Sequence, residues 1–354
     1  MNENENIVAE TAARILADLA DPQTINRAKD EAWAAPLWRA LAEAGLTLAW
    51  VPEKLGGGGA GMAEGFDALR VAGRFAVPVP LAETMLAGWL LARAGIPSPN
   101  GPMTVAPARP KERIALQSDG TLSGRARGVP FGRGAEHFAV LAESDAGASV
   151  ALVKADAVRI AEGRNLADEP SNTLMFERAR PLALAPAPAG LDPTTLLLMG
   201  AAVRSTQTAG ALEAVLAMSV RYANERVAFE RPIAKFQAVQ HNLARLAGET
   251  AAAVAAAGSA ADAIANAQAF DEGVRLEAIS AKIRCAEAAQ EGAAIAHQVH
   301  GAIGFTKEHV LHRFTLRMLA WRDDFGHESH WAVALGHLVA ARGADAFWPL
   351  IASR

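Results

Sequence analysis

Apolar residues recur at helical spacing through the first part of the chain. Four of them fall on one face of a helix: Trp33, Leu37, Leu41 and Ala44. Gly45 follows directly and supplies a stop signal. Two further helical stretches cover residues 66–75 and 81–94. We therefore predict an N-terminal helical domain over residues 1–100.

The pattern changes at residues 96–112, where five prolines mark a domain boundary. Short apolar runs separated by Gly, Asp and Pro signals then continue to about residue 185, which is typical of strands. These runs read RIALQ, TLSGRA, HFAVLAE, SVALVKA, VRIAEG and NTLMFERA. We predict a compact antiparallel β domain over residues 101–188.

Helix-period sequence returns after Asp192 and Pro193, which suit an N-cap and a first-turn proline. The expected helices are long and apolar on a broad stripe, and lie near 193–225, 234–268, 271–299, 307–322 and 327–342. Short connections between long helices are typical of an antiparallel bundle, here over residues 189–354. The expected fold class is mainly α with a central β domain.

Composition narrows the classes of function. A formal net charge of −4 and the lack of a long Lys/Arg run argue against a nucleic-acid partner. The one cysteine, Cys285, agrees with a reducing cytoplasm, and its helical surroundings favour a buried, inert thiol. The start MNENENIVAE has no signal-peptide pattern, and no apolar stretch is long enough to span a membrane. We expect a cytoplasmic protein with no membrane partner.

Paired histidines are one candidate for metal chemistry. His309 with His312, and His327 with His330, are each spaced by about one helical turn. The run HESH, however, lacks the two-residue gap of a His-Glu-x-x-His zinc site. Solvated or capping histidines are the simpler interpretation, and we expect no metal site.

A first candidate binding motif is the stretch RYANERVAFERPIAKFQAVQ, residues 221–240. Pro232 cannot lie inside a continuing helix, so one helix should end before it and another begin just after. Arg226 and Phe229 are then expected on the last turn before a bend. A fixed guanidinium, an aromatic face and free backbone N–H groups suit a pyrophosphate. A surface arginine beside a core phenylalanine is the alternative.

A second candidate motif is QVHGAIGF, residues 298–305, between two helices. Gly301 and Gly304 would let the backbone come close to a ligand, and the Gln298 amide could bond a ring or phosphate edge. The alternative is that the two glycines form only a helix C-cap and a turn.

Together, the two motifs resemble those of the acyl-CoA dehydrogenase family. The pattern Arg-x-x-Phe-x-x-Pro-Ile-x-x-Phe-Gln-x-Val-Gln precedes Gln-x-x-Gly-x-x-Gly-Phe by about sixty residues. WRALAEAGLTLAWVPEKLGGGGAG is similar to that family's opening helices, and DGTLSGRARGVPFGRGAEHFAVLAE to its β domain. The resemblance implies a helical domain, a small β-barrel and a C-terminal four-helix bundle. It also implies FAD at a subunit interface, in a dimer or a pair of dimers.

The resemblance assigns cofactor-binding residues to both motifs. In one subunit they would be Arg226, Phe229, Phe236 and Gln237. From the neighbouring subunit they would be Gln298, Gly301 and Gly304. Ala302 stands where the family usually has a second glycine, and its small side chain should adjust the loop without abolishing binding.

The reaction implied by the resemblance is α,β-dehydrogenation of an acyl-CoA thioester, in which a glutamate removes the α-proton. Family members carry that glutamate at one of two places, which here match Phe325 and Gly200. Asp324 or Glu328 could reach the thioester instead from a shifted backbone.

Several interpretations of the missing glutamate are open. The chain could be the base-less subunit of a heteromeric dehydrogenase for sterol or other bulky acyl groups, with a homologous larger subunit that carries the base. A shortened flavin-side loop around MTVAPARPKERIAL fits this hypothesis. Alternatives are a self-sufficient dehydrogenase, a non-catalytic structural subunit, a flavin oxygenase of the same fold and a plain helical scaffold. For a dehydrogenase, electron-transfer flavoprotein is the expected electron acceptor.

Overall fold

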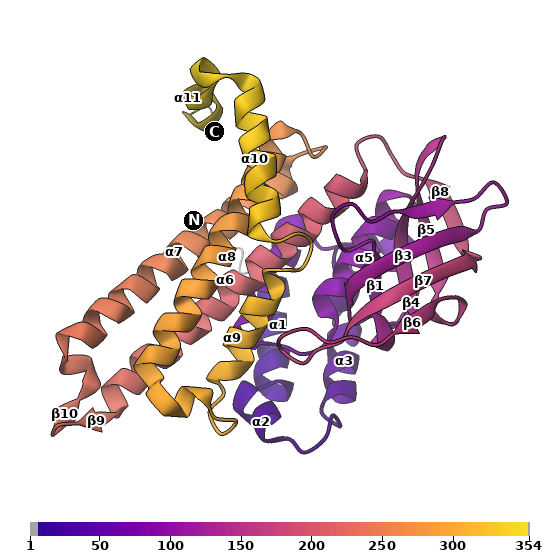
Figure 1. Cartoon of the computed structure of the whole chain (residues 1–354). Helices are drawn as coiled ribbons and strands as arrows, with labels where there is room; N and C mark the ends of the chain where they lie inside the picture. The colour runs from indigo at the N-terminus through magenta and orange to yellow at the C-terminus, as the bar shows by residue number, and fades with distance from the viewer. Residues whose placement is uncertain (1–5, 353–354) are drawn as a thin grey trace.

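The computed structural model describes residues 6–352 and has helices at both ends of the chain with a sheet between them (Figure 1). This confirms the predicted fold class. Residues 1–5, part of the stretch in which no signal peptide is predicted, lie outside the described residues. The predicted domain limits at residues 100 and 188 stay predictions.

The N-terminal part is helical. Its helices are α1 (Ile7–Leu19), α2 (Pro22–Arg27), α3 (Ala34–Glu43), α4 (Met62–Arg74) and α5 (Leu81–Arg93), with short 3-10 turns η1 (Leu46–Leu48) and η2 (Glu53–Leu55). The predicted apolar face of α3 is confirmed, because Leu37 and Leu41 are fully buried. Gly45 has φ +72° and ends that segment, as its type predicts. Helix α5 is buried along nearly its whole length, so it forms a core element.

One sheet makes up the middle of the chain. Its strands are β1 (Met103–Ala106), β2 (Ile114–Leu116), β3 (Leu122–Pro130), β4 (His137–Ser144), β5 (Gly147–Lys154), β6 (Arg159–Ala161), β7 (Ser171–Ala179) and β8 (Ala183–Pro186). The strand order is β6-β7-β3-β2-β4-β5-β8, with β1 beside β4. The prediction of a purely antiparallel domain is wrong, because β1 and β2 both pair with β4 in parallel. Strand β3 pairs antiparallel with β2, and the chain then reverses again, so that β4 runs parallel to β1 and β2.

The C-terminal part is a helical bundle. Its helices are α6 (Pro193–Glu225), α7 (Gln237–Asn266), α8 (Glu272–His300), α9 (Leu311–Trp321), α10 (Glu328–Arg342) and α11 (Ala344–Ala352). The predicted N-cap is confirmed, since the Asp192 carboxylate accepts a hydrogen bond from the Thr195 N–H at 2.7 Å. Helix α6 is buried from Thr195 to Leu212 and packs against α4, α7 and α8. It therefore joins the N-terminal helices to the bundle.

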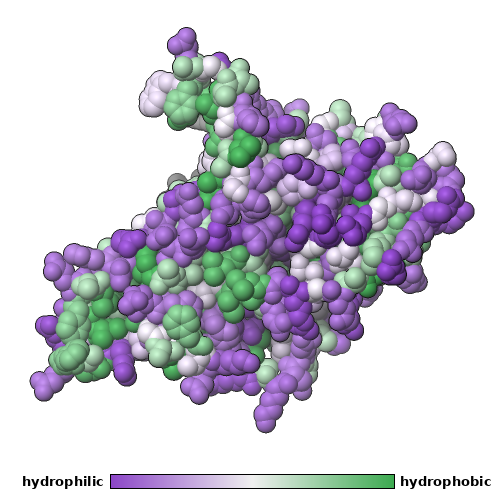
Figure 2. All heavy atoms as spheres, in the orientation of Figure 1, coloured by the Kyte–Doolittle hydropathy of each residue, from purple (hydrophilic) through white to green (hydrophobic). Residues whose placement is uncertain are grey.

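Helices α10 and α11 extend away from the body of the molecule (Figure 1). Helix α11 follows Gly343, where the helical pattern was expected to end, and it was not predicted. Its Trp348 side chain is 70% exposed and Phe347 is 46% exposed. Figure 2 shows apolar atoms on this arm and at the opposite end of the bundle.

No helix among residues 6–352 is long and apolar enough to cross a membrane. Over the same residues, no group of three or more His, Cys, Asp or Glu side chains could hold a metal ion. Cys285 is buried, and burial raises the pKa of its thiol to about 12. The thiol is therefore protonated and unreactive at neutral pH, as predicted.

Candidate functional site

The first motif forms a corner between α6 and α7. Helix α6 ends at Glu225 and α7 begins at Gln237, so the predicted break around Pro232 is confirmed. Arg226 caps α6, and its N–H donates to the Tyr222 carbonyl at 2.8 Å. Its guanidinium is exposed and forms no ion pair with any of residues 6–352. The corner therefore presents an unpaired positive charge.

Phe229 is not on the last turn of α6, and that prediction is wrong. The residues between the helices form a hairpin of β9 (Val227–Ala228) and β10 (Arg231–Pro232), followed by the 3-10 turn η5 (Ile233–Lys235). Phe229 and Glu230 both have positive φ, +51° and +63°. Positive φ at both central residues is the geometry of a type I′ hairpin turn, which matches the strand twist.

Aromatic side chains gather at this corner. The Phe229 side chain is 90% exposed, and its ring centre lies 6.1 Å from that of Phe236 in an edge-to-face arrangement. The Arg231 guanidinium carbon lies 4.4 Å from the centre of the Phe236 ring. Gln237 is exposed as the first residue of α7. The corner thus offers ring faces, a helix start and positive charge to a ligand.

The second motif forms a turn after α8, which we call the glycine hinge (residues 298–305). Gly301 ends α8 with φ +64° and leads into the 3-10 turn η6 (Gly301–Phe305). Gln298 and Gly301 are exposed and, with Ala302, line a surface groove of about 580 Å³. Gly304 is buried, and a Cβ there would lie 3.0 Å from the His300 Cβ. The glycine hinge therefore exposes its backbone at Gly301 and packs tightly at Gly304.

The corner and the hinge lie at the same end of the bundle. Tyr222, one turn before Arg226, stacks on His300, one residue before Gly301, with ring centres 4.5 Å apart. The two motifs are therefore neighbours within one chain. His309 near the hinge is held by the backbone, since its Nδ1 accepts from the Leu311 N–H at 3.1 Å.

The two positions proposed for a glutamate base meet in space. Gly200 lies in the buried part of α6, and Phe325 follows α9. A Cβ added to Gly200 would come within 2.4 Å of the Phe325 ring. Phe325 is 1% exposed, and its carbonyl accepts from the Trp331 indole N–H at 3.0 Å. The Phe325 ring therefore packs directly against the backbone of Gly200.

Asp324 is engaged in a buried ion pair. Its carboxylate accepts from the Arg204 Nε at 2.9 Å, and the same guanidinium binds Glu83 and the Gln207 side chain. Burial raises the pKa of Asp324 and of Glu83, and Arg204 opposes both shifts. Burial alone would lower the pKa of Arg204, but the two carboxylates outweigh it and raise that pKa.

Lys282 completes this buried cluster. Its ammonium group donates to the carbonyls of Trp321 at 2.6 Å and of Asp324 at 2.8 Å. Burial lowers the pKa of Lys282 to about 8. Arg204 and Lys282 were missed by motif analysis. An arginine at the end of the apolar stretch LLLMGAAVR, within a long predicted helix, was a signal for a buried charge with partners.

Glu328, the other proposed base, lies at the start of α10 and forms an ion pair with Arg322. Burial opposes ionisation of Glu328, but two hydrogen bonds, one of them from Arg322, and the positive charges of Arg322 and His327 together outweigh it and lower the pKa of that carboxyl. Both candidate carboxylates are thus committed to arginines. The three heavy atoms nearest to a Cβ added at Gly200 all belong to the Phe325 ring.

Known proteins resemble this chain along most of its length. The model of the acyl-CoA dehydrogenase N-terminal domain matches residues 2–98, and that of the C-terminal domain matches residues 193–323. Acyl-CoA dehydrogenase IpdE2 of Mycobacterium tuberculosis is 30% identical over 321 residues, which cover 89% of this chain and 91% of IpdE2.

Two solved structures share the fold closely. The ChsE4-ChsE5 complex from Mycobacterium tuberculosis contains a chain that matches with a TM-score of 0.85 at 26% identity, covering 97% of this chain and 99% of that one. A variant of the Tcur3481-Tcur3483 steroid ACAD matches with a TM-score of 0.81 at 26% identity, covering 95% and 97%.

Proposed function

We propose that this chain, which belongs to the acyl-CoA dehydrogenase family, is the base-less subunit of a heteromeric enzyme. As a member of this family it is an FAD-dependent oxidoreductase for α,β-dehydrogenation of acyl-CoA thioesters. The observation that carries the finer proposal is the packing of the Phe325 ring against Gly200. That ring takes the space of both alternative bases.

A catalytic base must be a carboxylate that can accept the α-proton, with its pKa raised toward the working pH. Asp324 is held by Arg204 in a buried network, and Glu328 is held by Arg322. Releasing Asp324 would leave the Arg204 charge partly uncompensated in the protein interior, which is strongly unfavourable. We therefore assign proton abstraction to a partner chain.

The corner and the hinge fit the flavin nucleotide. The unpaired Arg226 guanidinium suits a pyrophosphate, which arginine binds through two parallel hydrogen bonds. The exposed Phe229 ring and the Phe236 ring offer stacking faces beside Gln237. We propose that these residues hold FAD from one subunit and that the exposed Gln298 and Gly301 contact it from the neighbour. Gly304, predicted as a third contact, is buried and instead lets the turn pack against His300. When bound, FAD accepts the β-hydrogen of the substrate as a hydride.

The proposed assembly follows from the same residues. Phe229 is 90% exposed and Phe305 is 74% exposed at the end of the bundle that carries both motifs. Exposed aromatic side chains of this kind are typical of protein interfaces. The relatives named ChsE4 and ChsE5 form a complex, and the Tcur3481-Tcur3483 protein is a steroid ACAD. We propose a homologous larger subunit, a bulky acyl group such as a steroid, electron-transfer flavoprotein as acceptor and a cytoplasmic location.

The experiment compares the chain alone with its complex with a homologous, glutamate-bearing partner. We expect that the complex binds FAD, is bleached by acyl-CoA without oxygen and exchanges the α-proton of the substrate with D₂O. The chain alone should be neither bleached by acyl-CoA nor able to exchange the α-proton of the substrate. In the complex, Glu328→Gln should keep the exchange rate within about twofold, because Glu328 is not the base.

Replacing the partner's glutamate by glutamine should abolish exchange while flavin absorbance is kept. Bleaching and exchange by the chain alone would contradict the proposal. So would loss of exchange in the Glu328→Gln complex with an unchanged melting temperature and flavin content.

A further inference from the structure

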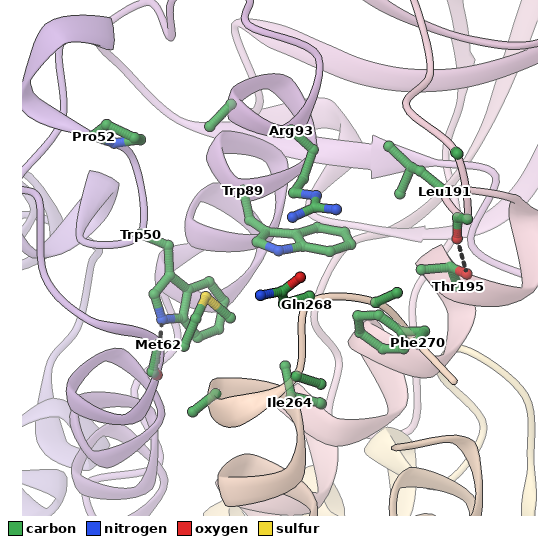
Figure 3. A pocket seen from close by; sticks show the side chains of 16 residues that line it. Trp50, Pro52, Met62, Trp89, Arg93, Leu191, Thr195, Ile264, Gln268 and Phe270 are labelled. Atoms are coloured by element: carbon green, nitrogen blue, oxygen red, sulfur yellow. Dashed lines mark hydrogen bonds between the residues drawn. The ribbon is translucent and has the colours of Figure 1, made fainter. Parts of the chain in front are cut away.

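A cavity separate from the flavin motifs lies where the N-terminal helices meet the bundle (Figure 3). It encloses about 360 Å³. Its walls come from α5, the start of α4, the loop before α6 and the connection between α7 and α8. Phe325, Gly200 and the two motifs do not line it. It is therefore a second concave site on the chain.

Aromatic side chains form three sides of this cavity. Trp50 and Trp89 are each 6% exposed, and the Phe270 ring lies edge-on to Trp89 with centres 6.2 Å apart. The Trp50 indole is fixed, because its N–H donates to the Met62 carbonyl at 3.1 Å. Gly65 gives it room, since a Cβ there would lie 2.0 Å from the indole nitrogen. The cavity is thus preformed and suited to a flat ring.

The polar groups of the cavity are mostly donors. Arg93 is the one charged residue in its lining, which contains no Asp or Glu. Within residues 6–352 the Arg93 guanidinium forms no ion pair, and neither the Trp89 indole N–H nor the Gln268 side chain has a hydrogen-bond partner. Figure 3 shows the Gln268 amide in the middle of the cavity, below the Trp89 ring. The Thr195 hydroxyl, by contrast, already donates to the Gly190 carbonyl at 2.8 Å.

We propose that this cavity binds a small planar aromatic carboxylate. Its ring would lie among Trp50, Trp89 and Phe270, and its carboxylate would accept hydrogen bonds from Arg93 and Gln268. Charge-assisted bonds of this kind are stronger than neutral ones. The volume is at the lower end of small-molecule sites, about 300–1,000 Å³, and suits one or two fused rings.

Such a ligand would contact the N-terminal helices and the bundle at once. Trp89 and Arg93 belong to α5, while Gln268 and Phe270 belong to the connection between α7 and α8. Since a ligand stabilises the state that it binds, occupancy would strengthen the packing between these two parts. The inference does not depend on the flavin motifs or on the missing base.

The experiment titrates the purified full-length chain with 2-naphthoate and with neutral 2-naphthamide by calorimetry. We expect 2-naphthoate to bind with a dissociation constant on the order of 0.1 mM and the amide about tenfold more weakly, since one charge-assisted contact is lost. Arg93→Gln should weaken naphthoate about tenfold and leave the amide unchanged. The control Arg39→Gln, at an exposed arginine on α3, should change neither.

Ala92→Phe places a ring into the cavity that Ala92 lines, and should abolish binding of both probes. Its folding is checked by circular dichroism and melting temperature. The inference is overturned if neither probe binds the unsubstituted chain at about 10 mM. It is also overturned if the amide binds as tightly as the acid, or if Arg93→Gln leaves naphthoate binding unchanged.

Discussion

Replacing Gly200 by alanine tests whether the Phe325 ring fills the site of the missing base. The added Cβ would lie 2.4 Å from the ring carbons Cγ and Cδ1. Ordinary carbon contacts are about 3.5–4.0 Å, so the overlap is about 1 Å. The ring is 1% exposed and cannot move out into solvent. We therefore expect overpacking at this contact.

Two effects set the magnitude. Overpacking a well-filled core costs about 1–3 kcal/mol. Replacing glycine by alanine inside a helix stabilises by about 1 kcal/mol. Gly200→Ala alone should therefore lower the free energy of unfolding by at most about 2 kcal/mol. With Phe325→Ala in place, which itself should cost about 3–5 kcal/mol, the ring is gone and Gly200→Ala should stabilise.

A double-mutant cycle separates these effects. The free energy of unfolding of the unsubstituted chain, both single variants and the double variant is measured by urea denaturation with circular dichroism. We expect a coupling free energy of about 1–3 kcal/mol between the two positions. A coupling below about 0.5 kcal/mol, the range of independent sites, would refute the contact and with it the argument that the ring occupies the base position.

Three further predictions concern the buried charges and the corner. Arg204→Met leaves Glu83 and Asp324 buried without their cation, and should lower the free energy of unfolding by about 3–5 kcal/mol in urea titrations. Because the pKa of Lys282 is lowered to about 8, the unfolded chain binds more protons above that pH, and stability should rise by about 1 kcal/mol from pH 7 to pH 9. Urea midpoints of Lys282→Met should lack this rise. Arg226→Gln should lower the FAD content of the purified protein several-fold, measured from flavin absorbance, with an unchanged melting temperature; equal FAD content would remove Arg226 from the proposed site.

Much of the fold was predictable because its signals are local. The long helices of the bundle show the 3.6-residue period, and the breaks at Gly45 and Pro232 depend on residue types that restrict the backbone. The hairpin at Phe229 was missed because its type I′ turn lacks the usual glycine or asparagine. The parallel pairing of β1 and β2 with β4 was missed because pairing depends on contacts between distant segments.

The candidate site was predictable only in part. Its motif residues were found from the spacing of a few side chains. The groups that bind Asp324 lie far away in the sequence: Arg204 on α6 is 120 residues away, and Lys282 on α8 is 42 residues away. In the sequence, Phe325 and Gly200 are two separate candidate positions for a base. The structure shows that these two positions, neither of which carries a glutamate, are in contact through the Phe325 ring. This contact depends on the three-dimensional packing and could not be predicted from the sequence.

The left-handed backbone at Phe325 has a consequence for how readily a catalytic base could be introduced at this position. Its φ is +56°, and its ring is accommodated because Gly200 has no side chain. Phe325→Glu alone would place a carboxylate in an apolar space shaped for a ring, without the room or the solvation that a proton acceptor needs. Recovery would require repacking several neighbours together. A single substitution at Phe325 should therefore not give the chain a catalytic base of its own.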